Sequence, residues 1–232
     1  MRKTDVLDYL KANQDARGIK HWEKYREESG GLRSYGVGLT NLRKYAKTVG
    51  KDPALAAQLW RSSVYEMKII SLLIDDPKAI TIEQAERQVE ELNGGNLAHV
   101  FSSCDATLAK APFVVELADR WVTSKDPVRR RCGYGLVYEI SKSKKKSAPD
   151  EDYFLQHIAR IDKEFSKQPI WTLMAMGSAL MGMGKRTKKL HVAALKVARK
   201  IGPIDFDPEG NCDPTDIEKH LMSDHVRAKL GV

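Results

Sequence analysis

The stretch that decides the fold is SVYEMKIISLLIDDP, residues 63–77. Its apolar residues recur at intervals of three and four, which is the spacing of one face of an α-helix. They are Val64, Met67, Ile70, Leu73 and Ile74. Ser62 or Ser63 is placed to cap the start, with Glu66 as the capping-box partner of Ser63. Pro77, after two aspartates, predicts the end of this helix.

The same helical pattern continues along the whole chain, outward from this segment. Several helices before and after this segment are preceded by a capping residue or opened by a proline. These residues are Thr40, Asp52 with Pro53, Thr81, Pro112 and Pro127. Alternation with a period of two, which strands require, is missing. The sequence therefore predicts an all-α protein of roughly a dozen helices.

Short helices that each carry one apolar stripe bury it best by pairing with their neighbours and stacking the pairs. This arrangement is an α-α superhelix of HEAT or ARM type, and a compact helical bundle is the alternative. We expect one such domain over residues 1–232. The polar segment SKSKKKSAPDED, residues 141–152, predicts an exposed loop within it.

The segment WTLMAMGSALMGMGKRTKK, residues 171–189, contains small residues among four methionines. Small residues let two helices approach closely, so we expect core packing here, with Gly182 or Gly184 near the helix end. The next helix is amphipathic, and an inward stripe is predicted for it. That stripe is Leu190, Ala194, Val197, Ala198 and Ile201.

The whole chain has a formal net charge of +8, and its positive charge is concentrated in the second half. No acid occurs in residues 166–204, and a second basic run lies just upstream. Such separation of charge is typical of proteins that bind a polyanion. The residues predicted to contact nucleic acid are Arg129, Arg130, Arg131, Lys142, Lys185, Arg186, Lys188 and Lys189.

The cysteines exclude some classes of site. Cys104, Cys132 and Cys212 are widely spaced, which argues against a disulfide framework and against a zinc site. We therefore expect no metal and no cofactor. A long apolar segment and an apolar leader are both missing, so we expect neither membrane insertion nor secretion, and a cytoplasmic location.

Residues 93–105, NGGNLAHVFSSCD, bring a histidine and a cysteine close together in sequence. A thiol needs a neighbouring base to act as a nucleophile. If residues 97–108 form one helix capped by Asn96, His99 and Cys104 point in different directions. Cys104 then lies in the apolar stripe, and a core position is expected for it.

Several stretches resemble the DNA alkylation repair family of HEAT-like repeat proteins, which includes bacterial N-alkylpurine DNA glycosylases. They are YGVGLTNLRKYAK at 35–47, LAAQLWRSSVYEMKIISLLIDDPKAIT at 55–81, RW and VRRRCGY within 120–134, and the lysine-rich helix that ends in ARKIG. The resemblance is spread over residues 35–220. Its most specific pattern is LW-x-S-x-x-x-E, formed by Leu59, Trp60, Ser62 and Glu66. It implies a right-handed solenoid whose concave, basic surface holds duplex DNA.

The resemblance also implies catalysis by an aspartate in a W-D-x-x-D motif on a central helix. In this sequence the motif falls on residues 95–99, where Gly95 replaces the tryptophan, Asn96 follows, and His99 replaces the catalytic aspartate. Loss of a purine develops positive charge on the sugar, which a carboxylate stabilises and a histidine does not. We therefore assign no catalytic residue and expect His99 to be exposed on the first turn of its helix.

Two further family features can be compared with this sequence. Ser178 stands where the resemblance implies a second tryptophan, so that aromatic contact with the lesion is also lost. Arg129 and Arg130 match the paired arginines that the family uses on the DNA backbone.

We expect a DNA-binding member of this family that holds duplex or structured DNA, damaged or branched, without the usual glycosylase activity. One alternative is an active glycosylase with a rearranged site, in which Asp105 approaches the lesion because the helix begins later. Another alternative is a HEAT-type adaptor that binds an acidic protein partner. The expected state is a monomer, associated with the nucleoid in a bacterium.

Overall fold

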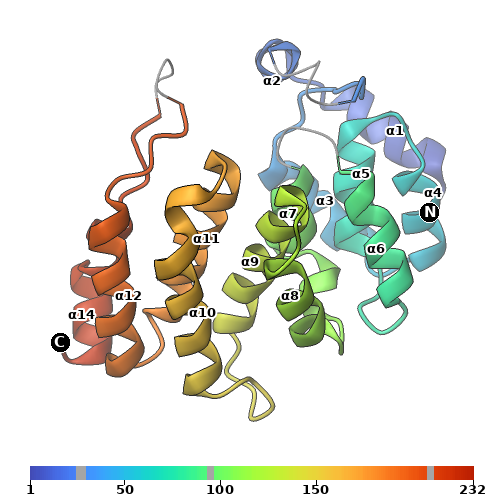
Figure 1. Ribbon diagram of the computed structural model, residues 1–232. Helices are drawn as coiled ribbons and strands as arrows, with labels where there is room; N and C mark the ends of the chain where they lie inside the picture. Colours follow the sequence, from blue (N-terminus) through green and yellow to red (C-terminus); the bar gives the residue numbers. More distant parts are fainter. Residues whose placement is uncertain (25–29, 93–96, 208–211) are drawn as a thin grey trace. The chain divides into compact units, whose positions relative to one another are not determined.

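The computed structural model describes residues 1–24, 30–92, 97–207 and 212–232. Within these ranges the chain forms fourteen α-helices and two 3-10 helices, with no β-strand. Backbone pairing of the β type is limited there to two isolated bridges, Arg33 with Val64 and Ile204 with Thr215. The prediction of an all-α chain of roughly a dozen short helices is confirmed (Figure 1).

The chain divides into two compact units, Met1–Val114 and Val115–Val232, and each is described by itself. The helices of unit 1 are α1 (Lys3–Ala12), α2 (Ala16–Glu23), α3 (Leu39–Val49), α4 (Pro53–Trp60), α5 (Tyr65–Ile74), α6 (Ile82–Glu90), α7 (Leu97–Ser102) and η1 (Thr107–Lys110). Those of unit 2 are α8 (Val114–Val122), α9 (Pro127–Ser141), α10 (Glu151–Glu164), η2 (Phe165–Lys167), α11 (Ile170–Met183), α12 (Lys188–Ile201), α13 (Ile217–Leu221) and α14 (Asp224–Leu230).

Helix α5 is the centre of unit 1, because α3, α4 and α7 all pack against it. The sequence predicts one apolar face for this helix, but every residue from Glu66 to Ile74 is buried. Even Lys68 is buried, and Trp60 satisfies its ammonium group. The Nζ of Lys68 donates to the Trp60 carbonyl at 2.5 Å and lies 4.3 Å from the centre of the Trp60 ring. Helices on several sides therefore bury α5 all round.

The predicted cap of α5 is wrong by one or two residues, because the helix begins after Val64 and no side chain caps it. The backbone around Ser63 is paired with Arg33 instead. The Arg33 amide donates to the Ser63 carbonyl at 2.8 Å, and the Tyr65 amide donates to the Arg33 carbonyl at 2.8 Å. Glu66 forms no capping box either, since its carboxylate accepts hydrogen bonds from Ser34 and from residues 35 and 37.

Other predicted helix starts agree with the structure where the capping residue contacts an amide of its own helix. Asp52 accepts from the Leu55 amide ahead of Pro53, and Thr81 accepts from the Gln84 amide. Pro127 opens α9 as predicted. Thr40 is not a cap, because α3 already begins at Leu39 after Gly38. The helix predicted to open at Pro112 begins at Val114.

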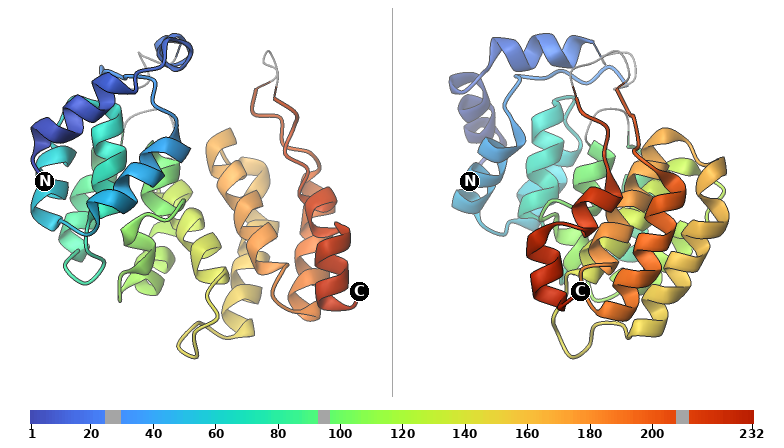
Figure 2. Two further views of the ribbon diagram at one scale, coloured as in Figure 1. Left: turned by 180° about the vertical axis from the view of Figure 1, so that it is seen from behind. Right: turned by 90° about the vertical axis from the view of Figure 1, so that its left-hand side faces the viewer.

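Helices α9 and α11 form the core pair of unit 2 and run parallel (Figure 2). At their first turns, Thr172 Oγ1 donates to the Pro127 carbonyl at 3.1 Å. Near their last turns, a side chain at Gly182 would collide with Ser141 and Tyr138, so glycine permits the close approach that the sequence predicts. Gly184 ends α11, as predicted.

Helix α12 packs on α10 and α11. Its predicted stripe is buried at four positions, and Ile201 is half-buried. Residues 142–150 form the predicted loop between α9 and α10.

Candidate functional site

The first candidate site lies in unit 1, where α7 ends. The sequence predicts one helix over residues 97–108, but α7 stops at Ser102 and η1 begins only at Thr107. Between them Cys104 and Asp105 have φ angles of 57° and 71°, in the left-handed region that L-residues rarely adopt. These two residues therefore turn the chain back toward the helix it has just left.

This turn brings together the two residues that the sequence predicts to point apart. Cys104 Sγ lies 3.1 Å from His99 Nε2, and the prediction of a core position for Cys104 is wrong because the thiol is half-buried. His99 itself is exposed, as predicted. The geometric argument from helical rotation fails because Cys104 is no longer helical.

Ser103 fixes how the imidazole of His99 is used. The Ser103 hydroxyl donates to the His99 carbonyl at 2.6 Å, and the same oxygen lies 3.3 Å from His99 Nδ1. A hydroxyl has one proton, so an oxygen that donates to the carbonyl accepts from the ring. The proton of a neutral imidazole then lies on Nδ1, and the lone pair of Nε2 faces the Cys104 thiol.

A basic cavity of about 180 Å³ lies beside this turn. Asp105 lines it and forms an ion pair with Arg43 of α3. Lys51 Nζ donates to the Leu73 carbonyl at 3.0 Å, and its pKa is lowered by burial and by the charge of nearby Lys110. Apposed cations of this kind favour an anion between them. The charged residues that line the cavity are Arg43, Lys47, Lys51, Asp105 and Lys110.

The second candidate site lies in unit 2, at the first turns of α9 and α11. Because the two helices are parallel, the positive ends of both helix dipoles lie there together. Arg129 pairs with Asp126 at 3.5 Å. Arg131 stands over Trp171, with its guanidinium carbon 5.2 Å from the ring centre. Helix N-termini with arginines beside them are suited to bind phosphate.

Trp171 is the residue of this site that the sequence prediction misses. Its side chain is 44% exposed, although tryptophan usually lies mainly in the interior. Its ring packs against Phe206, with 6.0 Å between the ring centres. The tryptophan stands seven positions before Ser178, where the resemblance implies one, and a comparison of positions alone does not find it. Ser178 is half-buried and donates to the Met174 carbonyl.

Arg130 supports this end of unit 2 from within. Its guanidinium donates to the carbonyls of Ser124 and Lys125 at 2.9 and 2.8 Å and to the Gln168 side chain at 3.0 Å. These contacts join the turn before α9 to the turn before α11. Arg130 therefore holds the two helix starts together, whereas Arg129 and Arg131 lie beside them.

The other predicted residues gather at the opposite end of the α9–α11 pair, roughly 16 Å along α9 at 1.5 Å per residue. Arg186 donates to the carbonyls of Ser141 and Ser143 and lies 4.5 Å from the centre of the Phe154 ring. Burial lowers the pKa of Arg186. The remaining residues at this end are Lys142, which pairs with Glu139, Lys189, which pairs with Glu151 and Asp152, Lys185, and the exposed Lys188.

The position that the resemblance gives to the catalytic motif can be followed only in part. Gly95 and Asn96 lie outside the described residues, and His99 is engaged with Ser103 and Cys104. Within the described ranges, no three His, Cys, Asp or Glu side chains come together as a metal site. None of the described helices has the length and apolar character needed to cross a membrane.

Comparison with known proteins gives two matches. A family model described as DNA alkylation repair enzyme matches residues 6–203. A solved structure reported for "a new family of proteins related to the HEAT-like repeat DNA glycosylases with affinity for branched DNA structures" resembles this chain with a TM-score of 0.83 and 20% identity, over 100% of this chain and 97% of that chain. At this identity the likeness shows the fold, and it confirms the HEAT-like prediction. No curated protein matches the chain.

Proposed function

This chain belongs to the DNA alkylation repair family, and from that premise we propose that it binds duplex or branched DNA through the first turns of α9 and α11. One observation carries this proposal: two parallel helices present their N-termini beside Arg131 and the exposed Trp171. Phosphate binds at the arginine and at the N-terminus of α11, which no side chain caps, whereas the Asp126 carboxylate caps α9. The indole stacks on an unpaired base. Branched DNA can hold such bases where its arms meet, and the protein of similar structure is described as having affinity for branched DNA.

We further propose that DNA binding occurs without excision of an alkylated base by the family's usual mechanism. The resemblance places His99 at the position of the catalytic aspartate, and the ring of His99 is engaged with a thiol and a hydroxyl. The nearby acid, Asp105, is held by Arg43. A carboxylate neutralised in this way stabilises positive charge on a sugar less well.

The binding test is fluorescence anisotropy with a labelled duplex and a labelled junction that holds unpaired bases at its branch point, between about 50 and 200 mM salt. Affinity should fall steeply with salt, because bound arginines release counterions from phosphate. Arg131→Glu should weaken binding about tenfold and lower the salt slope by about one. Trp171→Ala should weaken junction binding more than duplex binding.

Lys188→Glu is the matched control, because it makes the same charge change at the opposite end of the helix pair. Equal losses for Arg131→Glu and Lys188→Glu would mean that only net charge matters, and the proposed interface would then be rejected. The excision test is release of base from alkylated duplex at enzyme excess. Release that disappears in Asp105→Asn would establish the rearranged glycosylase instead.

A further inference from the structure

The turn after α7 holds a nucleophile, a base and an orienting group in contact. Cys104 Sγ lies 3.1 Å from His99 Nε2, and Ser103 Oγ lies 3.3 Å from His99 Nδ1. A nucleophile activated by a base, with the base oriented by a third group, is the recurring arrangement of covalent catalysis. The half-buried thiol, unlike buried Cys132, is accessible to a small reagent.

The basic cavity beside this turn suggests which electrophile the thiol would meet. Asp105, the residue after Cys104, lines a cavity whose other charged groups are all cations. Cations placed where negative charge develops stabilise a departing anion. An alkyl ester of a phosphorus or sulfur oxyacid combines the two requirements, since its carbon is attacked by sulfur and its oxyanion leaves.

We propose that Cys104 is an alkyl acceptor, with His99 as its base, Ser103 as the positioning residue and the basic cavity as the binding site for the oxyanion. The thiol proton passes to His99 Nε2, and the thiolate attacks the alkyl carbon. The S–C bond forms as the C–O bond breaks, and the oxyanion leaves with the electron pair. The imidazolium returns its proton to solvent. The product is a stable thioether, so each chain accepts one alkyl group.

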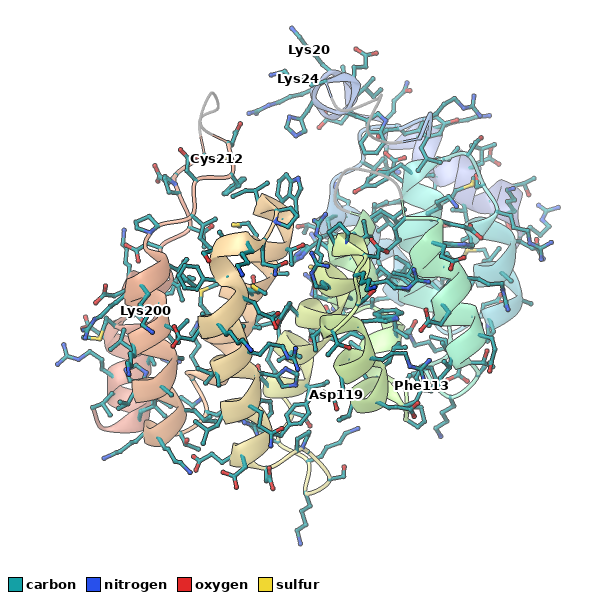
Figure 3. All side chains as sticks on the ribbon, in the orientation of Figure 1. Lys20, Lys24, Phe113, Asp119, Lys200 and Cys212 are labelled. Atoms are coloured by element: carbon teal, nitrogen blue, oxygen red, sulfur yellow. The ribbon has the colours of Figure 1, made fainter. Side chains whose placement is uncertain are left out.

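The test uses the full-length chain and methyl methanesulfonate, with methylation of each cysteine followed by peptide mass spectrometry. Cys212, an exposed cysteine between α12 and α13, is the internal reference (Figure 3). An ordinary thiol slows about tenfold for each pH unit below about 8, because only its thiolate reacts. Near pH 6.5 we expect Cys104 to react about tenfold faster than Cys212, after allowance for the lower nucleophilicity of an activated thiolate.

Variants separate the base from its surroundings. His99→Asn should bring the Cys104 rate to within about twofold of the Cys212 rate, because the proton acceptor is lost. His225→Asn, at an exposed histidine of α14, is the matched control and should change nothing. Equal rates for Cys104 and Cys212 in the unmodified protein, or a rate indifferent to His99→Asn in a variant that melts normally, would overturn the proposal.

The role of the cavity has its own comparison. Lys110→Gln should slow methylation by methyl methanesulfonate about threefold but should not slow methylation by trimethylsulfonium, because its leaving group, dimethyl sulfide, carries no charge. Equal effects on both reagents would remove the cavity from the proposal.

A second methyl donor, duplex DNA carrying methyl phosphotriesters, shows whether the ester that Cys104 accepts from is part of DNA or a small molecule. This experiment alone rests on the proposed function. Transfer from the duplex that weakens in Arg131→Glu would assign the DNA-borne ester. Transfer from methyl methanesulfonate alone would assign the small ester, and the salt titration would judge DNA binding independently.

Discussion

Glu66 offers the sharpest test of how unit 1 is held together. Its side chain is fully buried, and its Oε1 accepts from the Ser34 hydroxyl at 2.6 Å, the Tyr35 amide at 2.9 Å and the Val37 amide at 3.3 Å. These three hydrogen bonds attach the segment before α3 to the central helix α5. Glu66→Ala removes the common acceptor and leaves all three donors without it.

The cost follows from the environment of those donors, since Val37 is buried and Ser34 and Tyr35 are half-buried. A buried donor left unpaired costs about 1–3 kcal/mol, and water that enters the new space offsets part of the sum. We expect Glu66→Ala to lower the free energy of unfolding by about 4 kcal/mol, which is a large part of an ordinary stability of roughly 5–15 kcal/mol. For a chain of this length the melting temperature should fall by roughly 8–16 °C.

Circular dichroism melts measure the global effect, and hydrogen exchange at residues 35 and 37 measures the local one. Glu66→Gln keeps an acceptor oxygen and should cost less than half as much. Glu116→Ala, which breaks an exposed ion pair with Arg120, should cost at most about 0.5 kcal/mol. One weak contact changes the melting temperature by about 2 °C at most. A melting temperature for Glu66→Ala that lies closer than this to that of the parent would refute this reasoning. Unchanged hydrogen exchange at both amides would refute it too.

The remaining predictions concern unit 2. Arg186→Ala should cost about 2 kcal/mol in urea unfolding, because carbonyls at the end of α9 lose their donor, while DNA affinity changes less than about twofold. Gly182→Ala should destabilise by about 1–3 kcal/mol despite the better helix propensity of alanine, and adding Ser141→Ala should recover much of this loss in the same melts. Burial lowers the pKa of His157 below its ordinary 6.5, against the opposing effect of Asp119 at 3.1 Å. The unfolded chain therefore binds the proton more readily below about pH 6.5, so stability should fall from pH 7 to pH 5, and less so in His157→Asn.

The helices are predictable from the sequence where their determinants are local. Asp52 and Thr81 cap their own helices through contacts three residues away, and these positions hold in the structure. The start of α5 is not predictable in this way, because its backbone near Ser63 pairs with Arg33, thirty positions earlier in the sequence. The same distant segment takes Glu66 away from the capping box. A strong local motif is thus overruled by a tertiary contact that satisfies more backbone groups.

The LW-x-S-x-x-x-E pattern has a structural explanation in these contacts. Leu59 is fully buried, and Trp60 donates from its indole nitrogen to Glu91 at 2.8 Å. Ser62 Oγ accepts from the Val64 amide at 3.2 Å, at the start of α5, and Glu66 attaches the segment before α3. Each residue of the pattern therefore stabilises the junction around α5. In this chain the pattern has a structural role within unit 1.

The site at the end of α7 escapes sequence reasoning for a different reason. An apolar periodicity continues from Leu97 to Leu108, and both of those side chains are buried, so the pattern is consistent with one helix. The helix ends because Cys104 and Asp105 adopt positive φ, a conformation that is uncommon for residues other than glycine, although aspartate adopts it more often than most. Asp105 is then held by Arg43 of α3, a contact across sixty-two positions. The approach of Cys104 to His99 thus depends on tertiary structure.

Net charge locates a basic region but does not say what each cation does. Arg130 and Arg186 stand in the two clusters that predict nucleic-acid binding, yet both donate to main-chain carbonyls at the ends of α9. Their planar guanidinium groups suit this task, because one group satisfies two carbonyls at once. Arg131 differs, since it lies over an exposed aromatic ring beside two helix N-termini. A run of positive charge in this chain therefore combines cations that stabilise the fold with cations that are placed to face a ligand. The hydrogen-bond acceptors of each side chain in the structure distinguish the two groups.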